Sequence, residues 1–381
     1  MKQMLLWAYL ALVSSATAAV LPLKPAVLKE MRRVADWQII HQSETHYGVE
    51  NWVNGALMLG MTDLGELIER LSGDCSYTNW VLGCGEGIRY RPAVRSGNIS
   101  HADDLCVPQA WLRLYQRFGG QKRLEPTKKR LDSILVQPSE VPLDFRKGGK
   151  SLERWSWCDA LYMAPQTFAQ MSIITGDPKY MAFMDAEFKA TTDYLYDKEE
   201  HLYFRDTRYF PTGDTKRPNL EANGAKIFWG RGNGWVIGGL ANLLRILPKD
   251  ANERPYYEKL YKEMANRLAK LQCKDGYWHA SLLDPASFPA PETSATGFVV
   301  YGLAWGINAG ILDRDTYLPT VTRGWNALVA TVNSNGKLGY VQQIGANPQK
   351  VTKDMTMAYG VGAFLQAGVQ VWLLAPETSE K

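Results

Sequence analysis

Cysteine and histidine are scarce in this chain of 381 residues, with five of each. Five cysteines are too few for a disulfide scaffold, and no two of them have the C-x-x-C spacing of zinc and redox motifs. No pair of histidines has metal-ligand spacing either. The sequence therefore predicts no metal site and no cofactor. It leaves open whether Cys75 pairs with Cys84 or whether both are free thiols.

Blocks of basic charge are also missing. The chain has 43 Lys and Arg against 39 Asp and Glu, a formal net charge of +4, and no Lys/Arg run of the kind that binds nucleic acid. The glycine-rich run "GRGNG" at 230–234 lacks the lysine and Ser/Thr of a Walker motif, and a dinucleotide G-x-G-x-x-G is absent. We therefore expect neither nucleic acid nor nucleotide as a partner, whereas a small anionic ligand is compatible with the charge.

Long hydrophobic runs are absent apart from a short one at the N-terminus. The apolar run at 4–13 follows a basic start and is shorter than the ~20 residues that a membrane span requires. Ala16-Thr17-Ala18 then fits the small-residue cleavage pattern of a secretory signal. The sequence predicts a signal peptide over residues 1–18, export to the periplasm or the exterior, and no membrane span.

Helical patterns dominate the rest of the chain. Six segments that are apolar nearly all round lie at 52–64, 105–118, 161–175, 235–247, 293–310 and 357–375. Six amphipathic segments alternate with them, and the first, at 25–41, completes the last apolar segment at the other end of the chain. Because a helix that is apolar on all faces must be enclosed, we predict an all-α (α/α)6 barrel, a six-hairpin toroid formed by one catalytic domain over residues 25–376.

The loops before the apolar helices are long and rich in aromatic residues and glycine, so they should meet at one mouth of the toroid and carry the site. Asp159 opens one of these helices directly after Trp155 and Trp157, and Asp103 and Asp104 open another. An aspartate in such a partly dry setting has its protonated form favoured, which suits a general acid. Helix capping is the alternative explanation for each of these residues.

The other side chains near this mouth suit a sugar that carries a carboxylate. Tryptophan faces pack on sugar rings, and arginine pairs with carboxylates in a bidentate manner. The glycines of 230–234 should let the backbone turn sharply into an inner helix, so that Arg231 and Trp235 point at the cavity. The candidate substrate-binding residues are Trp157, Arg205, Lys226, Trp229, Arg231, Trp235, Trp278, His279 and Glu292.

Five segments carry a family resemblance: "CDALYMAP", "FWGRGNGWV", "DGYWHASLLD", "PETSATGFVVYG" and "AYGVGAFLQAG", in this order along the chain. Together they resemble the unsaturated rhamnogalacturonyl hydrolases of glycoside hydrolase family 105 and, more distantly, the unsaturated glucuronyl hydrolases of family 88. The resemblance covers most of the chain from about Lys29 onward. It implies the same (α/α)6 barrel, and it leaves monomer and homodimer both open.

The resemblance also implies a substrate and a mechanism. These enzymes act on lyase-generated oligosaccharides that end in a 4,5-unsaturated uronic acid, and they hydrate the double bond. Asp159 would protonate C4 and then, as a carboxylate, help to activate the water that adds at C5. Asp103 or Asp104 matches the second aspartate of the family, and Arg231 and Trp235 match its substrate-binding positions.

One departure leaves the polysaccharide open among rhamnogalacturonan, ulvan-type and other sources. Where family members often carry a His-Gly-Trp-Asp run, this chain has "FRDTRYF", with Arg205 or Asp206 in the place of the histidine. Two other functions are compatible with the sequence. One is an inverting glycosidase that uses Asp159 with Glu292, roughly 6.5 to 9.5 Å apart. The other is a carbohydrate-binding toroid without catalysis.

Overall fold

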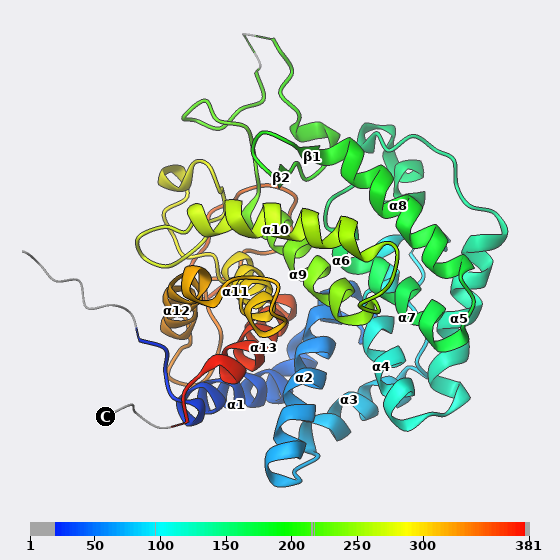
Figure 1. Ribbon diagram of the computed structural model, residues 1–381, viewed down its shortest axis with the longest axis horizontal. Coiled ribbons are helices and arrows are strands. Elements are labelled where there is room, and N and C mark those ends of the chain that lie inside the picture. Colours follow the sequence, from blue (N-terminus) through cyan, green and yellow to red (C-terminus); the bar gives the residue numbers. More distant parts are fainter. Residues whose placement is uncertain (1–19, 96, 215, 217, 378–381) are drawn as a thin grey trace, which may run out of the picture.

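The computed structural model describes residues 20–377 except 96, 215 and 217, so the predicted signal peptide lies outside the described residues. Helices and short 3-10 turns account for almost all of its regular structure (Figure 1). A single two-stranded antiparallel hairpin joins β1 (Tyr196–Asp197) to β2 (Leu202–Tyr203) within the described residues. No helix among these residues has the length and apolar character needed to cross a membrane.

Six helical segments form an inner ring. Each packs against its neighbours around the ring, and α13 closes it by packing on both α11 and α2. Residues 293–307 of α11 and 230–244 of α9 are buried on every side, as the sequence pattern predicts. The inner segments are α2 (Gly55–Ser72), α4 (Pro108–Phe118), α6 (Ala160–Met163) with α7 (Pro165–Thr175), α9 (Gly230–Ile246), α11 (Thr293–Asn308) and α13 (Ala358–Leu374).

Six amphipathic helices surround this ring, and each packs against an inner helix. The first of them, α1, lies beside the last inner helix, α13, so the two ends of the chain complete one hairpin (Figure 1). The predicted (α/α)6 barrel is therefore confirmed. The outer helices are α1 (Lys24–His41), α3 (Ser76–Gly87), α5 (Gln121–Val136), α8 (Lys179–Leu195), α10 (Arg254–Lys270) and α12 (Arg314–Ala330).

The third inner helix is broken, whereas the sequence pattern predicts one continuous segment over 161–175. The break falls at Pro165, which has no amide hydrogen and begins α7. The side-chain amide of Gln166 donates to the carbonyl of Leu161 at 3.2 Å and to that of Gly239 at 2.7 Å. The carbonyl that proline leaves without a backbone partner is thus satisfied by the next side chain.

The closure between α2 and α13 requires a glycine. A Cβ on Gly362 would lie 2.1 Å from the backbone carbonyl carbon of Ala56. The two helices can approach this closely only because position 362 has no side chain. A different kind of contact holds the middle of α2, where Asp63 accepts hydrogen bonds from Arg113 of α4 at 2.7 Å and from Arg245 of α9 at 3.1 Å.

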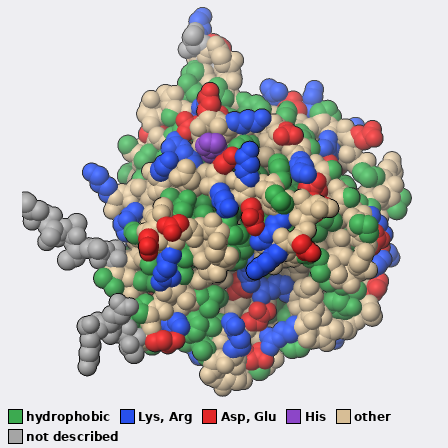
Figure 2. Space-filling model, in the orientation of Figure 1, with side chains coloured by type: hydrophobic (Ala, Val, Ile, Leu, Met, Phe, Trp, Pro, Cys, Tyr) green, Lys and Arg blue, Asp and Glu red, His purple; other side chains and the backbone are tan. Residues whose placement is uncertain are grey.

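Lys and Arg side chains alternate with Asp and Glu over the face shown in Figure 2, and several surround a hollow near its centre. Among the described residues, the six short 3-10 turns all lie in loops that lead into inner helices. These are η1 (Gln42–Glu44), η2 (Trp52–Asn54), η3 (Ala102–Leu105), η4 (Phe145–Glu153), η5 (Thr207–Tyr209) and η6 (Pro285–Ser287).

Candidate active site

A cavity of about 240 Å³ lies where the loops that precede the inner helices meet. Its volume is below the ~300–1,000 Å³ of sites for drug-sized ligands, so it suits one sugar ring better than a long chain. Its wall combines aromatic, acidic and basic side chains. They are Trp52, Arg95, His101, Asp103, Phe145, Leu152, Trp157, Asp159, Met163, Arg205, Ile344 and Gly345.

Asp159 stands at the start of α6 and lines this cavity. Its carboxylate forms no side-chain cap on the helix, so capping does not explain its presence there. Burial raises its pKa, the charge of Arg205 opposes that rise, and the charge of Asp103 adds to it. The carboxyl group therefore holds its proton to a higher pH than an aspartate in water, as a general acid requires.

The two adjacent aspartates have different surroundings, which the sequence could not distinguish. Asp103 lines the cavity, and its carboxylate accepts a hydrogen bond from Nη1 of Arg95 at 3.0 Å. Asp104 is fully buried and accepts from the backbone amide of Arg95 at 3.0 Å. Burial raises the pKa of both carboxyl groups. Asp103 is thus the carboxylate that shares the cavity with Asp159, while Asp104 holds the Arg95 segment in place.

His101 is a cavity residue that the sequence analysis missed. Its Nδ1 accepts from the backbone amide of Asp103 at 3.3 Å, so the ring proton of the neutral form is on Nε2. Burial, reinforced by the charge of Arg95, lowers the pKa of His101 to about 4. Its ring lies 5.2 Å from that of Trp157, centroid to centroid. The cavity therefore contains a neutral imidazole, and the run "HADD" was the available signal for it.

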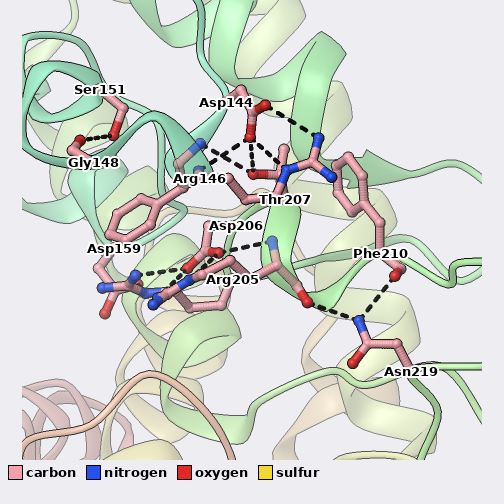
Figure 3. Close-up of polar contacts among 12 residues, drawn as sticks. Asp144, Arg146, Gly148, Ser151, Asp159, Arg205, Asp206, Thr207, Phe210 and Asn219 are labelled. Atoms are coloured by element: carbon pink, nitrogen blue, oxygen red, sulfur yellow. Dashed lines mark hydrogen bonds and ion pairs between the residues drawn. The ribbon is translucent and has the colours of Figure 1, made fainter. Parts of the chain in front are cut away.

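Arg205 joins the cavity to a network of ion pairs on the loop after β2 (Figure 3). Its Nη1 donates to Asp206 at 2.7 Å, and Asp206 also accepts from Nε of Arg208 at 2.8 Å. Both guanidinium groups lie over the ring of Phe145, at 4.8 and 4.3 Å from its centroid. Burial raises the pKa of Asp206, but the hydrogen bond from Arg208 and the charge of Arg205 outweigh it and lower that pKa. Asp206 is therefore an anion that fixes Arg205.

The glycines of 230–234 do not make the sharp turn expected of them. All three lie among the first five residues of α9, and none has a positive φ. They permit close packing instead, since a Cβ on Gly230 would lie 2.3 Å from the carbonyl oxygen of His279. This expectation was wrong. Glycine serves both where the backbone must turn and where two segments must pack closely, and the sequence alone does not tell which of the two applies.

Arg231 is buried beside the cavity and does not line it. Its two terminal nitrogens donate to the carbonyls of Gln342 at 2.7 Å and Gln343 at 2.9 Å. Its guanidinium lies 4.3 Å from the ring of Trp229 and 4.8 Å from that of Tyr359. In this arrangement Arg231 positions the loop that carries Ile344 and Gly345, both of which line the cavity.

Most of the other predicted binding residues are also packed away from the cavity. Trp229 donates to the side chain of Gln342, and Trp278 donates to a backbone carbonyl of α10. Trp235 is buried among aromatic rings, including that of Phe298 at 4.2 Å. Of the nine candidates, Trp157 and Arg205 line the cavity.

Three charged or polar candidates have partners elsewhere. Lys226 pairs with Asp197 at 2.6 Å, and His279 contacts Asp275 at 3.1 Å. Glu292 is buried and caps α11 by accepting from the amides of Ser294 and Ala295. Glu292 is therefore a helix cap, the alternative to a catalytic role, and it does not line the cavity with Asp159.

Comparisons with known proteins agree with this fold. The model of Glycosyl Hydrolase Family 88 matches residues 29–374. The chain is 37% identical over 352 residues to an "Unsaturated 3S-rhamnoglycuronyl hydrolase" of Formosa agariphila, covering 90% of this chain and 89% of the relative. It is 41% identical over 281 residues to a protein of the same name from Alteromonas sp. (strain LOR), covering 71% of this chain and 66% of that relative.

A solved structure gives the same result. The glycosyl hydrolase family 88 protein from Bacteroides vulgatus superimposes with a TM-score of 0.79 at 27% identity, covering 92% of this chain and 99% of the other. Family 88 is the more distant of the two resemblances that the sequence motifs carry. Because the family model spans nearly the whole described chain, the protein is a glycoside hydrolase that belongs to Glycosyl Hydrolase Family 88.

Proposed function

We propose that this protein removes a 4,5-unsaturated uronic acid from the non-reducing end of an oligosaccharide by hydrating its double bond. The observation that carries the proposal is the cavity in which Asp159 and Asp103, two aspartates with raised pKa values, face two arginines. A group that must first give and then take a proton needs a pKa near the working pH, and burial supplies that shift. We also propose that residues 25–376 act as one catalytic domain and that the chain is exported.

In this mechanism Asp159 carries the proton in both directions. It protonates C4 of the enol ether, which leaves positive charge shared between C5 and the ring oxygen. A water molecule then adds at C5 and gives its proton to the Asp159 carboxylate. The hemiketal that forms opens, the bond to the leaving saccharide breaks, and Asp159 is protonated again for the next cycle. One water molecule is consumed for each glycosidic bond that is broken.

Arg95 and Arg205 are the proposed partners of the uronate carboxylate. Each lines the cavity, and Nη2 of Arg95 is buried without a hydrogen bond. Nε of Arg205 also has no hydrogen bond but lies 3.3 Å from Oδ2 of Asp159, so it would turn to the uronate when Asp159 is protonated. A bound carboxylate would satisfy such donors with charge-assisted hydrogen bonds. Trp157, which is also in the cavity wall, offers an aromatic face to the sugar ring.

The leaving saccharide is proposed from the relatives. The relatives from Formosa agariphila and Alteromonas sp. are named for 3S-rhamnoglycuronyl substrates. We therefore expect an unsaturated glycuronyl group linked to 3S-rhamnose to be preferred over an unsaturated rhamnogalacturonyl disaccharide. The "FRDTRYF" run supports a separate subclass, since it places Arg205 in the cavity where related enzymes often carry a histidine.

The test is ultraviolet absorbance of an unsaturated oligouronide incubated with the enzyme, run with mass spectrometry in heavy-oxygen water. Hydration removes the chromophore and places the label in the product from the unsaturated sugar. Release of saccharide with absorbance retained would instead indicate ordinary hydrolysis at C1. A comparison of the two disaccharides under the same conditions then decides the substrate subclass.

A further inference from the structure

Cys273, Asp275 and His279 bring three metal-binding side chains together in the loop between α10 and α11. One ligand atom from each lies within 4.8 Å of the other two. A tight turn makes this possible, since the amide of Gly276 donates to the carbonyl of Cys273 at 2.9 Å and Gly276 has a φ of +91°. The pattern Cys-x-Asp-x-x-x-His is neither a histidine pair nor a C-x-x-C, which is why the sequence analysis passed over it.

The contacts of His279 place one ring nitrogen opposite a carboxylate oxygen. Its Nδ1 lies 2.8 Å from the carbonyl oxygen of Ala290, and a carbonyl oxygen can only accept, so Nδ1 carries a proton. Its Nε2 faces a carboxylate oxygen of Asp275 at 3.1 Å, and that oxygen also accepts when ionised. In a neutral ring Nε2 has a lone pair, so two acceptors face each other. A proton on either group, or a metal ion that both groups bind, would satisfy this contact.

We propose that Cys273, Asp275 and His279 bind a divalent transition-metal ion, with zinc preferred. The bond from Nδ1 to a backbone carbonyl is the arrangement that orients metal-bound histidines. The His279 side chain is 5% exposed, so its ring is held in that orientation. The Cys273 thiol adds a soft ligand, which favours zinc over calcium or magnesium.

The ligand number predicts the character of the site. Zinc bonds of about 2.0–2.3 Å to sulfur, nitrogen and oxygen in a tetrahedron place ligand atoms roughly 3.3–3.8 Å apart. The observed separations, up to 4.8 Å, need only a small inward movement of the side chains. Three protein ligands leave a fourth position, to which water would bind. Asp275 is the most accessible ligand, with a 46% exposed side chain, so the ion would enter from its side.

This loop supports the start of α9. The amide of Gly230 donates to the carbonyl of Ala280 at 2.7 Å, and the amide of Leu282 donates to the carbonyl of Phe228 at 3.0 Å. A metal bound at 273–279 would therefore stabilise the segment that carries Arg231. This inference does not depend on the proposed reaction, because binding and stability can be measured without a substrate.

The experiment is a cobalt titration of the full chain after chelator treatment, followed by visible and near-ultraviolet absorption. We expect one Co²⁺ per chain, tetrahedral d–d bands and a thiolate-to-cobalt charge-transfer band, all displaced by Zn²⁺. At a free Zn²⁺ concentration of 100 times Kd, the melting temperature should rise by roughly 3 °C. Cys273→Ser should remove the charge-transfer band and weaken Co²⁺ binding at least ~10-fold.

Cys75→Ser is the matched control, because Cys75 is also a partly exposed thiol beside a carboxylate, that of Glu69, but has no histidine there. Its cobalt spectrum should equal that of the parent. If Cys273→Ser does not fold by circular dichroism, Asp275→Asn on the exposed ligand replaces it, with the same expected loss of affinity. A chain without the charge-transfer band, or a band that survives Cys273→Ser, would overturn the proposal.

Discussion

Nε of Arg205 lies 3.3 Å from Oδ2 of Asp159, in a contact whose geometry is that of an ion pair without a hydrogen bond. The positive charge opposes the rise that burial gives to the pKa of Asp159. Asp103 acts in the opposite direction on the same carboxyl group. The pKa of Asp159 therefore depends on burial and on charged neighbours, of which Arg205 and Asp103 have the largest effects and opposite signs. Substitution of either neighbour tests its effect separately.

Asp159→Asn should abolish most of the activity while substrate binding persists. The amide keeps the shape of the side chain but has no titratable proton, so turnover should fall ~10²- to 10⁴-fold, as for the loss of a general acid. Steady-state assay gives the rate, and equilibrium binding of an unsaturated disaccharide to the variant gives the affinity. Near-normal turnover would remove Asp159 from the mechanism.

Arg205→Gln should move the pH profile upward. Because the charge of Arg205 lowers the pKa of Asp159, its removal raises that pKa, and the protonated acid persists to higher pH. The alkaline limb of kcat/KM should therefore shift to higher pH, alongside a weaker affinity for the uronate. Arg208→Gln is the matched control. Arg208 also bonds Asp206 but does not line the cavity, so the alkaline limb of this variant should stay where it is in the parent.

Asp103→Asn should move the same limb downward. The charge of Asp103 raises the pKa of Asp159, so an uncharged amide lowers it and the acid loses its proton at lower pH. Asp104→Asn changes a buried carboxylate that bonds the Arg95 backbone, so the expected effect is a loss of stability of about 1–3 kcal/mol. Parallel pH profiles and denaturant titrations of the two variants distinguish these roles. A shift of the pH profile in Asp104→Asn but not in Asp103→Asn would show that Asp104 is the carboxylate that acts on Asp159.

The fold could be predicted from the sequence because a helix with apolar residues on all its faces must be buried. A segment such as 293–307, which is apolar nearly all round, must be enclosed by other helices. Pro165 can also be read from the sequence, but whether the helix breaks there cannot. The break requires a new partner for the carbonyl of Leu161, and the side chain of Gln166 provides it.

The site was less accessible to sequence reasoning, since it depends on which way each side chain points. Asp103 and Asp104 are adjacent and identical in type, yet one faces the cavity and the other is fully buried. Arg231 and Arg205 look equally suited to an anion, but backbone carbonyls occupy both terminal nitrogens of Arg231. Loop residues such as His101, Arg95 and Ile344 reach the cavity through turns that no periodic pattern predicts.

Gly362→Ala should destabilise the closure of the barrel. The new Cβ would lie 2.1 Å from the carbonyl carbon of Ala56, so α2 and α13 must separate, at a cost of at least the ~1–3 kcal/mol of overpacking. Gly83→Ala is the control: in α3 its Cβ would meet nothing within 4 Å. Helix propensity alone should then stabilise that variant by up to ~1 kcal/mol. Denaturant unfolding of both variants measures the change in unfolding free energy, which should be negative for Gly362→Ala and positive for Gly83→Ala.

Asp63→Asn should destabilise the barrel at neutral pH, because Asp63 bonds Arg113 of α4 and Arg245 of α9 from its position on α2. Removal of one member of a buried ion network leaves the remaining charges unpaired, at a cost of about 3 kcal/mol.

The same carboxylate predicts the pH dependence of stability. Burial raises the pKa of Asp63, but the charges of Arg245 and Arg113 outweigh it, and the pKa lies well below its usual range. A group with a depressed pKa stabilises the folded state above its unfolded pKa of ~3.9, and this contribution is lost as the pH falls below that value. The difference in unfolding free energy between the parent and Asp63→Asn should therefore be constant from pH 7 to 5 and shrink below pH 4. A difference that grows on acidification would contradict the ionised network.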